Sequence, residues 1–162
     1  MINWGVIGFG RMGKQYADCL KEKSNLFKLG GIASKSNFKN KDFNFYNSYE
    51  DLLNLDEIDA VYISTLNNTH KDLVILANKK NKKILCEKPL GMNFLEVKEL
   101  HSLFEKKKNH FLEAIAYRAH PITTELFEIL EDKELGNINR LESNFGFRVR
   151  KIKKESRLFN KE

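Results

Sequence analysis

The sequence predicts an α/β fold, in which helices cover both faces of a doubly wound, largely parallel sheet. Short apolar runs alternate along residues 1–118 with segments whose apolar residues recur at helical spacing. The first apolar run breaks into a turn with three glycines and continues directly as a helix. In sheets of this kind the ligand crevice lies at the carboxyl ends of the strands, so we expect the functional residues there.

The glycine turn lies within residues 3–14, N-W-G-V-I-G-F-G-R-M-G-K, and has the spacing G-x-G-x-x-G. Gly8 makes the tight turn, Gly10 lets the backbone approach a pyrophosphate, and Gly13 lets the helix pack closely on the strand. The phosphates would lie at the helix N-terminus, where free N–H groups and the helix dipole stabilise negative charge. An ordinary glycine turn is the alternative, but the strand before it and the helix after it favour a Rossmann-type cofactor site. We expect three more residues of the turn to contact the cofactor: Phe9, Arg11 and Met12.

The second apolar run, residues 29–33, ends in Ser34-Lys35-Ser36 and bears on the choice of cofactor. An acidic residue about 20 positions after the glycines binds the ribose 2′-hydroxyl of NAD, whereas NADP needs this place free of negative charge. No acid occurs before Asp42. Ser34 can donate to a phosphate oxygen and Lys35 can neutralise it, so the sequence favours NADP over NAD. An ordinary polar loop is the alternative.

The rest of the first domain repeats the alternation of strand and helix. The run over residues 59–64 is bounded by polar residues, as expected for a central parallel strand that is buried on both faces. We expect the other elements in this order: a short strand after Phe43, a helical turn capped by Ser48, a polar loop over residues 65–70, a helix over 71–79, a strand over 84–86, a helix capped by Asn93, and a strand over 111–116.

After residue 118 the pattern changes. A helix is expected from His120-Pro121 to about Leu135-Gly136, and apolar and polar residues then alternate over residues 139–150, which predicts a half-buried antiparallel strand. One such strand is not stable alone, so either its partners come from another chain or this is the first half of a longer protein. We therefore expect an NAD(P)-binding domain over residues 1–118 and the start of an incomplete α+β domain, for substrate binding and oligomerisation, over residues 119–162.

Composition and charge exclude several classes of function. The chain has 28 Lys and Arg against 22 Asp and Glu, a net charge of +6, but the basic residues are interleaved with acids and no recognition motif accompanies them. We therefore expect no nucleic-acid partner. Cys19 and Cys86 have no metal-binding spacing, and the first strand, starting at Asn3, leaves no room for a signal peptide. A cytoplasmic protein without a metal or a membrane span is expected.

Three motifs in this order resemble the Gfo/Idh/MocA family, named after glucose-fructose oxidoreductase and inositol dehydrogenase. They are the glycine turn, D-A-V-Y-I-S-T over residues 59–65, and C-E-K-P-L-G over residues 86–91. The resemblance extends along the whole chain, although Leu66 departs from it because proline is usual there. Segments 113–121, 145–148 and 156–160 are similar to the branch that contains dimeric dihydrodiol dehydrogenase and D-xylose dehydrogenase.

The resemblance implies an NAD(P)-dependent oxidoreductase that transfers hydride to or from the CH–OH carbon of a sugar, cyclitol or dihydrodiol. It places Lys88 beside the nicotinamide and the substrate, where an ammonium can hydrogen-bond the reacting oxygen and stabilise alkoxide character. The alternative for Lys88 is an ordinary solvated lysine. For His70, a ring that is hydrogen-bonded to backbone is as good an interpretation as a ligand role. The resemblance adds four cofactor contacts: Thr65, Asn67, His70 and Glu87.

The resemblance also implies residues that this chain does not contain. In the family, a glycine-rich segment after the position of residues 158–160 leads to an Asp and to a His that donates and accepts the proton. His101 and His110, on an expected helix surface and in a loop, are no substitutes. We therefore expect the 162-residue chain to be inactive alone and the full-length protein to be a homo-oligomer. A non-catalytic NAD(P)-binding module or partner subunit is the alternative. By analogy with the family, the Lys88-Pro89 bond is expected to be cis.

Overall fold

The computed structural model of the chain describes residues 1–36, 42–107, 109–132, 135–146 and 148. The chain divides into two compact units, Met1–Ala119 and His120–Glu162. Within the described residues, no helix has both the length and the apolar character needed to cross a bilayer.

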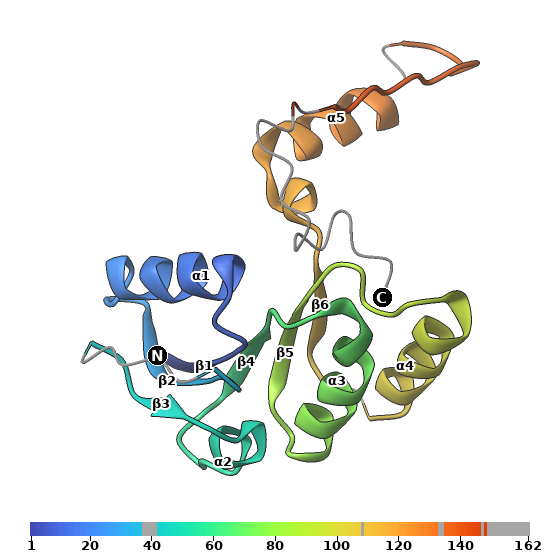
Figure 1. Cartoon of the computed structure of the whole chain (residues 1–162). Coiled ribbons are helices and arrows are strands. Elements are labelled where there is room, and N and C mark those ends of the chain that lie inside the picture. Colours follow the sequence, from blue (N-terminus) through green and yellow to red (C-terminus); the bar gives the residue numbers. More distant parts are fainter. Residues whose placement is uncertain (37–41, 108, 133–134, 147, 149–162) are drawn as a thin grey trace. The chain divides into compact units, whose positions relative to one another are not determined.

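The first unit is built on a six-stranded sheet whose strand order is β3-β2-β1-β4-β5-β6 (Figure 1). All five neighbouring strand pairs are parallel, which confirms the predicted doubly wound sheet. The strand order reverses between β1 and β4, and this switch point is where doubly wound sheets bind ligands. The strands are β1 (Ile2–Ile7), β2 (Phe27–Ala33), β3 (Phe45–Tyr46), β4 (Ala60–Ile63), β5 (Lys83–Glu87) and β6 (Phe111–Ala114).

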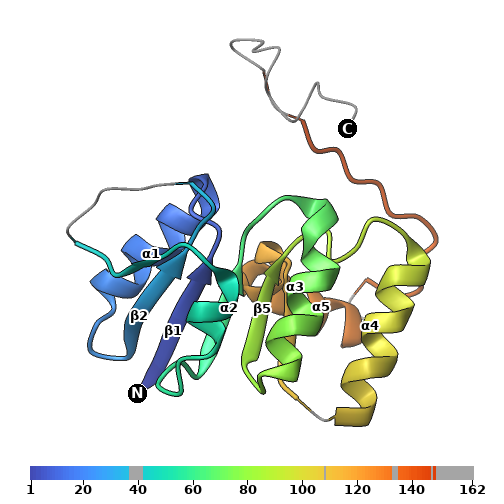
Figure 2. The same ribbon diagram turned by 60° about the horizontal axis from the view of Figure 1, so that its bottom comes forward.

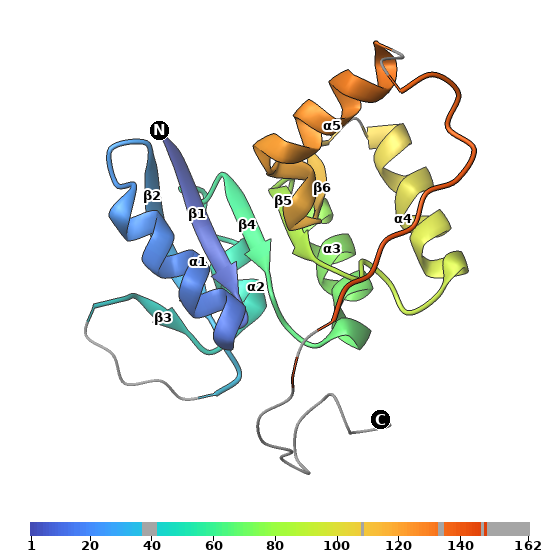
Figure 3. The same ribbon diagram turned by 90° about the horizontal axis from the view of Figure 1, so that it is seen from above.

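Helices cover the sheet from both sides. One face carries α1, which lies over β1 and β2 in Figure 3. The other face carries α2, α3 and α4, which lie in front of the sheet in Figure 2. The helices are α1 (Arg11–Glu22), α2 (Tyr49–Leu53), α3 (His70–Lys79) and α4 (Phe94–Lys107), with short 3-10 turns η1 (Asn67–Thr69) and η2 (Ala116–Ala119).

Strand β4 joins the two cores, because its side chains alternate between the faces of the sheet. Val61 and Ile63 pack in the core beneath α2, α3 and α4, whereas Tyr62 packs in the core beneath α1. All four residues of β4 are buried, as predicted for the central strand.

Polar side chains start the helices where the sequence predicted. Ser48 Oγ accepts a hydrogen bond from the Asp51 N–H at 3.2 Å, and Asn93 Oδ1 accepts one from the Glu96 N–H at 3.1 Å. Each satisfies a backbone donor that has no partner inside its helix. Strands β2 and β5 are longer than predicted, since they continue as far as their neighbours offer hydrogen-bond partners, and β6 ends earlier, at Ala114.

The second unit contains α5 (Pro121–Glu131), which begins at the predicted residue and ends before the predicted Leu135-Gly136. The strand predicted over residues 139–150 is wrong for its described part. Residues 139–146 and Arg148 form no strand and are exposed, and Phe145 is 93% exposed. A strand needs a neighbour to pair its backbone groups, and the described part of this unit contains none. The remaining residues of that prediction, and segment 156–160, lie outside the described residues.

Candidate active site

The candidate site lies at the carboxyl ends of the central strands. The glycine turn follows β1, residues 64–70 follow β4, and residues 88–91 follow β5. Two hydrogen bonds of Ser64 join the first two segments: its backbone N–H donates to the Ile7 carbonyl at 2.8 Å, and its hydroxyl donates to the Gly8 carbonyl at 3.1 Å. The residues of three sequence motifs therefore meet at one edge of the sheet.

The three glycines of the turn lack side chains for different reasons. Gly8 has a φ of +92°, and a Cβ there would lie 2.9 Å from Thr65 Cγ2. A Cβ at Gly13 would clash with the Gly8 carbonyl oxygen and would lie 2.9 Å from Ser64 Oγ. A Cβ at Gly10 would meet no atom within 4 Å, so packing inside the protein does not explain this glycine. The space beside Gly10 instead fits a ligand that approaches the backbone closely.

The start of α1 suits an anion. Gly10 is the residue that caps this helix, and it has no side chain to accept from the first N–H groups. The first turn contains no acidic residue. Free backbone donors and the positive end of the helix dipole therefore face the space beside Gly10. These features fit the pyrophosphate of a dinucleotide.

The other residues of the turn divide by exposure. Arg11 and Met12 are exposed at the start of α1. Phe9 is only 7% exposed, and its ring packs edge-to-face on the Phe45 ring with centroids 5.2 Å apart. The ring of Phe9 therefore belongs to the core, and little of the residue is left exposed for a cofactor.

Ser34 and Lys35, which follow β2, differ in exposure: Ser34 is buried and Lys35 is exposed. Ser34 is 7% exposed, its Oγ accepts from the Ser36 N–H at 3.3 Å, and its own N–H donates to the Tyr46 carbonyl at 3.1 Å. Ser34 Oγ thus closes a turn as an acceptor, as in the polar-loop alternative, and the expectation of Ser34 as a phosphate donor stays a prediction. Lys35 is exposed, with Nζ 5.7 Å from the centroid of the Tyr49 ring. Among the described residues that directly follow β2, Lys35 carries the positive charge.

The loop after β4 holds Thr65, Asn67 and His70. Thr69 Oγ1 donates to the Leu66 carbonyl at 2.7 Å, so the 2.6 Å contact between Thr65 and Thr69 uses the Thr65 hydroxyl as donor. Thr65 Oγ1 is left as an acceptor for a ligand, and Asn67, two residues further along the chain, is half-buried.

His70 has the contacts with backbone that the first of its two interpretations describes. The residue is fully buried. Its Nδ1 lies 2.8 Å from the Pro89 carbonyl oxygen and its Nε2 lies 3.3 Å from the Thr65 carbonyl oxygen. A direct cofactor contact of His70 stays a prediction, and the complete burial of the residue does not favour it.

Glu87 and Lys88 lie at the end of β5. The Tyr62 hydroxyl donates to Glu87 Oε1 at 2.6 Å. Burial, followed by this hydrogen bond, raises the pKa of Tyr62, so its hydroxyl remains a donor. Lys88 is exposed, and the Lys88-Pro89 bond is cis, as expected. The buried Tyr62 of β4 thus orients the Glu87 carboxylate, while the ammonium of Lys88 is accessible to solvent.

Cys86 precedes these residues, but its thiol is not reactive. The side chain is fully buried, and burial, followed by the charges of Glu87 and Glu113, raises the pKa of the thiol to about 12. A thiol is nucleophilic as the thiolate, so Cys86 is protonated and inert at neutral pH. Among the described residues no group of His, Cys, Asp and Glu could hold a metal ion.

An alkylation experiment checks this assignment. At neutral pH, iodoacetamide is expected to modify the exposed Cys19 and to leave Cys86 unmodified until the protein unfolds. The protonated thiol favours the folded state at pH values below its ordinary pKa of 9.0, and this contribution falls as the pH rises towards 12. Peptide mass spectrometry gives the modified fraction at each cysteine. Equal rates of modification in the folded protein would contradict the buried position of Cys86.

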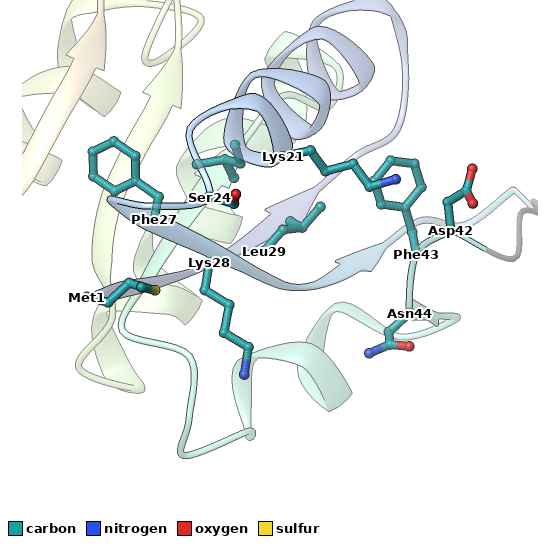
Figure 4. A pocket seen from close by; sticks show the side chains of 10 residues that line it. Met1, Lys21, Ser24, Phe27, Lys28, Leu29, Asp42, Phe43 and Asn44 are labelled. Atoms are coloured by element: carbon teal, nitrogen blue, oxygen red, sulfur yellow. The ribbon is translucent and has the colours of Figure 1, made fainter.

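A cavity of about 300 Å³ lies apart from these residues (Figure 4). It is located at the end of α1 and the beginning of β2, whereas the glycine turn is at the beginning of α1. Lys21 Nζ lies 4.3 Å from the centroid of the Phe43 ring at its wall. None of the predicted site residues lines this cavity.

Comparison with known proteins decides the family. The profile of the Gfo/Idh/MocA oxidoreductase family, described as having an NAD-binding Rossmann fold, matches residues 2–114. The chain belongs to this family. The matched residues contain the glycine turn, all six strands and the Glu87-Lys88-Pro89 segment.

Individual members of the family agree in sequence and fold. Trans-1,2-dihydrobenzene-1,2-diol dehydrogenase of Xenopus tropicalis is 29% identical over 157 residues, which cover 92% of this chain and 48% of the relative. D-xylose 1-dehydrogenase (NADP(+)) 2 of Haloferax volcanii is 39% identical over 104 residues, which cover 64% of this chain and 32% of the relative. The crystal structure of myo-inositol 2-dehydrogenase from Lactobacillus plantarum is 25% identical, with a TM-score of 0.75 over 85% of this chain and 43% of that one. The chain spans about half the length, or less, of these relatives.

Two residues of the family domain were missed by sequence reasoning. Tyr62 orients Glu87, and Glu113 in β6 accepts from the Leu90 N–H at 2.9 Å with Oε1. Each is a polar residue inside an apolar strand, and this is the signal that could have indicated a buried partner.

Proposed function

We propose that this chain provides the cofactor site and a substrate-orienting lysine of an NAD(P)-dependent oxidoreductase. The reaction is hydride transfer between the nicotinamide and the CH–OH carbon of a sugar, cyclitol or dihydrodiol. The observation that carries the proposal is the open backbone at Gly10, at the uncapped start of α1 in a chain of this family. The relatives named for a dihydrodiol, a xylose and an inositol dehydrogenase support the class of substrate.

The backbone after Gly10 and four side chains have the following roles in this proposal. The N–H groups after Gly10, with Arg11 beside them, bind the pyrophosphate. The exposed ammonium of Lys88 hydrogen-bonds the oxygen on the reacting carbon and stabilises the negative charge that develops there. The bound nicotinamide supplies the hydride acceptor. Thr65 and Asn67 border the cofactor, with Thr65 as an acceptor.

The proposal is tested first by measuring cofactor binding and then by measuring NADP reduction with candidate substrates. Fluorescence titration of the chain with NADPH and NADH is expected to give saturable binding, and its absence for both would overturn the proposal. The product of the complete reading frame is then assayed for NADP reduction with aldoses, inositols and dihydrodiols. Turnover that falls at least about 100-fold in Lys88→Met is expected. Unchanged turnover in this variant would exclude Lys88 from the reaction.

We propose NADP as the preferred cofactor, with Lys35 as the residue that reads the 2′-phosphate. The support is the exposed ammonium at the end of β2, with no acidic residue in the same short segment. The relative from Haloferax volcanii, named as an NADP(+) enzyme, agrees with this choice.

Removing this ammonium is expected to change cofactor preference. Lys35→Ala is expected to weaken NADPH binding about fivefold and to leave NADH binding unchanged, because an exposed ammonium stabilises a phosphate by about 1 kcal/mol. Ser34→Asp is expected to weaken NADPH more than NADH by repulsion. Fluorescence titration measures both, with Lys28→Ala as the matched control, because Lys28 is an exposed lysine at the other end of β2. Equal losses for the two cofactors in Lys35→Ala would contradict the role of this residue.

We also propose an organisation for the full-length protein. Residues 1–118 are its NAD(P)-binding domain, and residues 119–162 begin an α+β domain for substrate binding and oligomerisation. We propose a cytoplasmic homo-oligomer, which agrees with the two free cysteines. Light scattering of the complete reading-frame product tests the assembly, and a monomer would contradict it.

A further inference from the structure

Two side chains from different elements hold the turn that follows Lys88. His70, the first residue of α3, has Nδ1 2.8 Å from the Pro89 carbonyl oxygen. Glu113 of β6 accepts from the Leu90 N–H at 2.9 Å. We propose that His70 and Glu113 form a clamp that fixes the position of Lys88 in the cofactor site. Both are then positioning residues, and this inference rests on the function proposed above.

The His70 arm links the turn after β5 to the glycine turn. The Nε2 atom of His70 lies 3.3 Å from the carbonyl oxygen of Thr65. Thr65 packs so closely on Gly8 that a Cβ there would lie 2.9 Å from Thr65 Cγ2. Contacts therefore run without a gap from Gly8 through Thr65 and His70 to Pro89. The buried imidazole therefore packs between the segment beside Lys88 and the loop that contacts the glycine turn.

The two contacts of the imidazole are not equivalent. A neutral ring carries one N–H, and the shorter contact, from Nδ1, assigns it to the bond with the Pro89 carbonyl. Because an asparagine amide nitrogen is about as far from the backbone as Nδ1, His70→Asn can keep this donor. A glutamine amide reaches the more distant position of Nε2 instead, so His70→Gln loses it.

Glu113, in strand β6 next to β5, holds the same turn through the Leu90 N–H. Its carboxylate accepts a backbone N–H, which is a charge-assisted bond. Leu90, the donor, is 6% exposed and belongs to the core beneath α3 and α4. The Met92 N–H then donates to Glu96 Oε2 at 2.8 Å, at the start of α4. The chain after Lys88 is thus held at Pro89, Leu90 and Met92, while Lys88 itself is exposed. Such an arrangement limits the movement of the ammonium to that of its own side chain.

The test compares alanine variants with variants that keep the hydrogen bond. His70→Ala and Glu113→Ala lose the clamp, whereas His70→Asn and Glu113→Gln keep a donor or an acceptor oxygen. His101→Ala and Glu105→Ala are matched controls, because they remove an exposed His and an exposed Glu whose side chains lie 3.6 Å apart on α4. Each variant of the 162-residue chain is examined for thermal unfolding, NADPH affinity, and acetylation of the Lys88 amine with and without saturating NADPH.

Protection of Lys88 by NADPH separates positioning from folding. In the wild type, saturating NADPH is expected to slow acetylation of Lys88 about tenfold, which corresponds to about 1.4 kcal/mol. In both alanine variants we expect protection to fall to about twofold or less, although NADPH affinity changes by less than about threefold because the phosphates bind at α1. His70→Asn, Glu113→Gln and the controls are expected to keep the protection. Should His70→Ala not fold, His70→Gln takes its place, and should Glu113→Ala not fold, the His70 variants decide.

Several outcomes would overturn the clamp. Full protection of Lys88 in the alanine variants, or loss of protection in Glu113→Gln and His70→Asn when these are stably folded, contradicts it. Failure of the wild type to bind NADPH contradicts the proposed function instead. The clamp is then decided in the free protein by hydrogen exchange of the Leu90 amide, which we expect to be about tenfold faster in Glu113→Ala than in Glu113→Gln. Equal exchange rates would overturn it.

Discussion

Replacement of Gly10 by aspartate is expected to abolish NADPH binding while the protein remains folded. The new side chain has room, since a Cβ at this position meets no atom within 4 Å. Aspartate is a favoured residue at a helix N-cap, and the φ of −74° and ψ of −163° at Gly10 suit it. In the complex, however, its carboxylate would occupy the place of the pyrophosphate and repel it. We expect a loss of at least about 100-fold in affinity, or 2.7 kcal/mol or more.

Gly10→Asn separates the two causes of this loss. Asparagine has nearly the same shape as aspartate and also caps helices, but it carries no charge. It is expected to weaken NADPH about tenfold by occupying the space alone. Affinity is measured by fluorescence titration and folding by thermal unfolding, which we expect to be unchanged or raised in both variants. Wild-type affinity in Gly10→Asp would contradict a phosphate site at the start of α1.

Replacement of Gly13 by alanine is expected to lower the stability of the fold, in contrast to the Gly10 variants, which are expected to lose binding and stay folded. A Cβ at Gly13 would clash with the Gly8 carbonyl oxygen, which is backbone and cannot move aside without shifting β1. Alanine improves helix propensity by up to about 1 kcal/mol, but overpacking of this kind outweighs it. We expect the free energy of unfolding to fall by about 3 kcal/mol. Urea denaturation followed by circular dichroism measures it.

Gly10→Ala is the matched control for this substitution. It lies in the same turn, adds the same methyl group and meets no protein atom. Its effect on stability is expected to stay within about 1 kcal/mol, the scale of a changed N-cap. Equal destabilisation by the two alanine substitutions would contradict the close packing of α1 on β1 at Gly13.

The fold of the first unit could be predicted because its signals are local. The apolar runs at residues 59–64 and 84–86 are short and bounded by polar residues, and this pattern identifies buried parallel strands. Ser48 and Asn93 mark helix starts through bonds to residues three positions away. None of these inferences requires knowledge of a distant residue.

The strand predicted over residues 139–150 shows the limit of such signals. Its alternation of apolar and polar residues describes one face of a sheet, but a strand forms only when another strand pairs with its backbone. The described residues of the second unit offer no such partner. The alternation shows that this segment is suited to form a strand. It does not show whether a second strand is present to pair with it.

The candidate site was predictable at its glycines and less so at its polar side chains. Gly8, Gly10 and Gly13 act through backbone geometry that the motif itself specifies. The roles of His70 and Glu113 depend on atoms 19 and 23 residues away along the chain. Contacts of this kind follow from the packing of α3, β5 and β6 together, and no spacing in the sequence encodes them.

The most direct test of the account is to follow the backbone amide signals of the chain by NMR during titration with NADPH. We expect saturable shifts centred on Gly10 to Gly13, smaller shifts at Lys88, and loss of both in Gly10→Asp. Saturable binding with shifts centred instead on the cavity at Lys21 and Phe43, or no binding at all, would contradict the assignment of the glycine turn as the cofactor site.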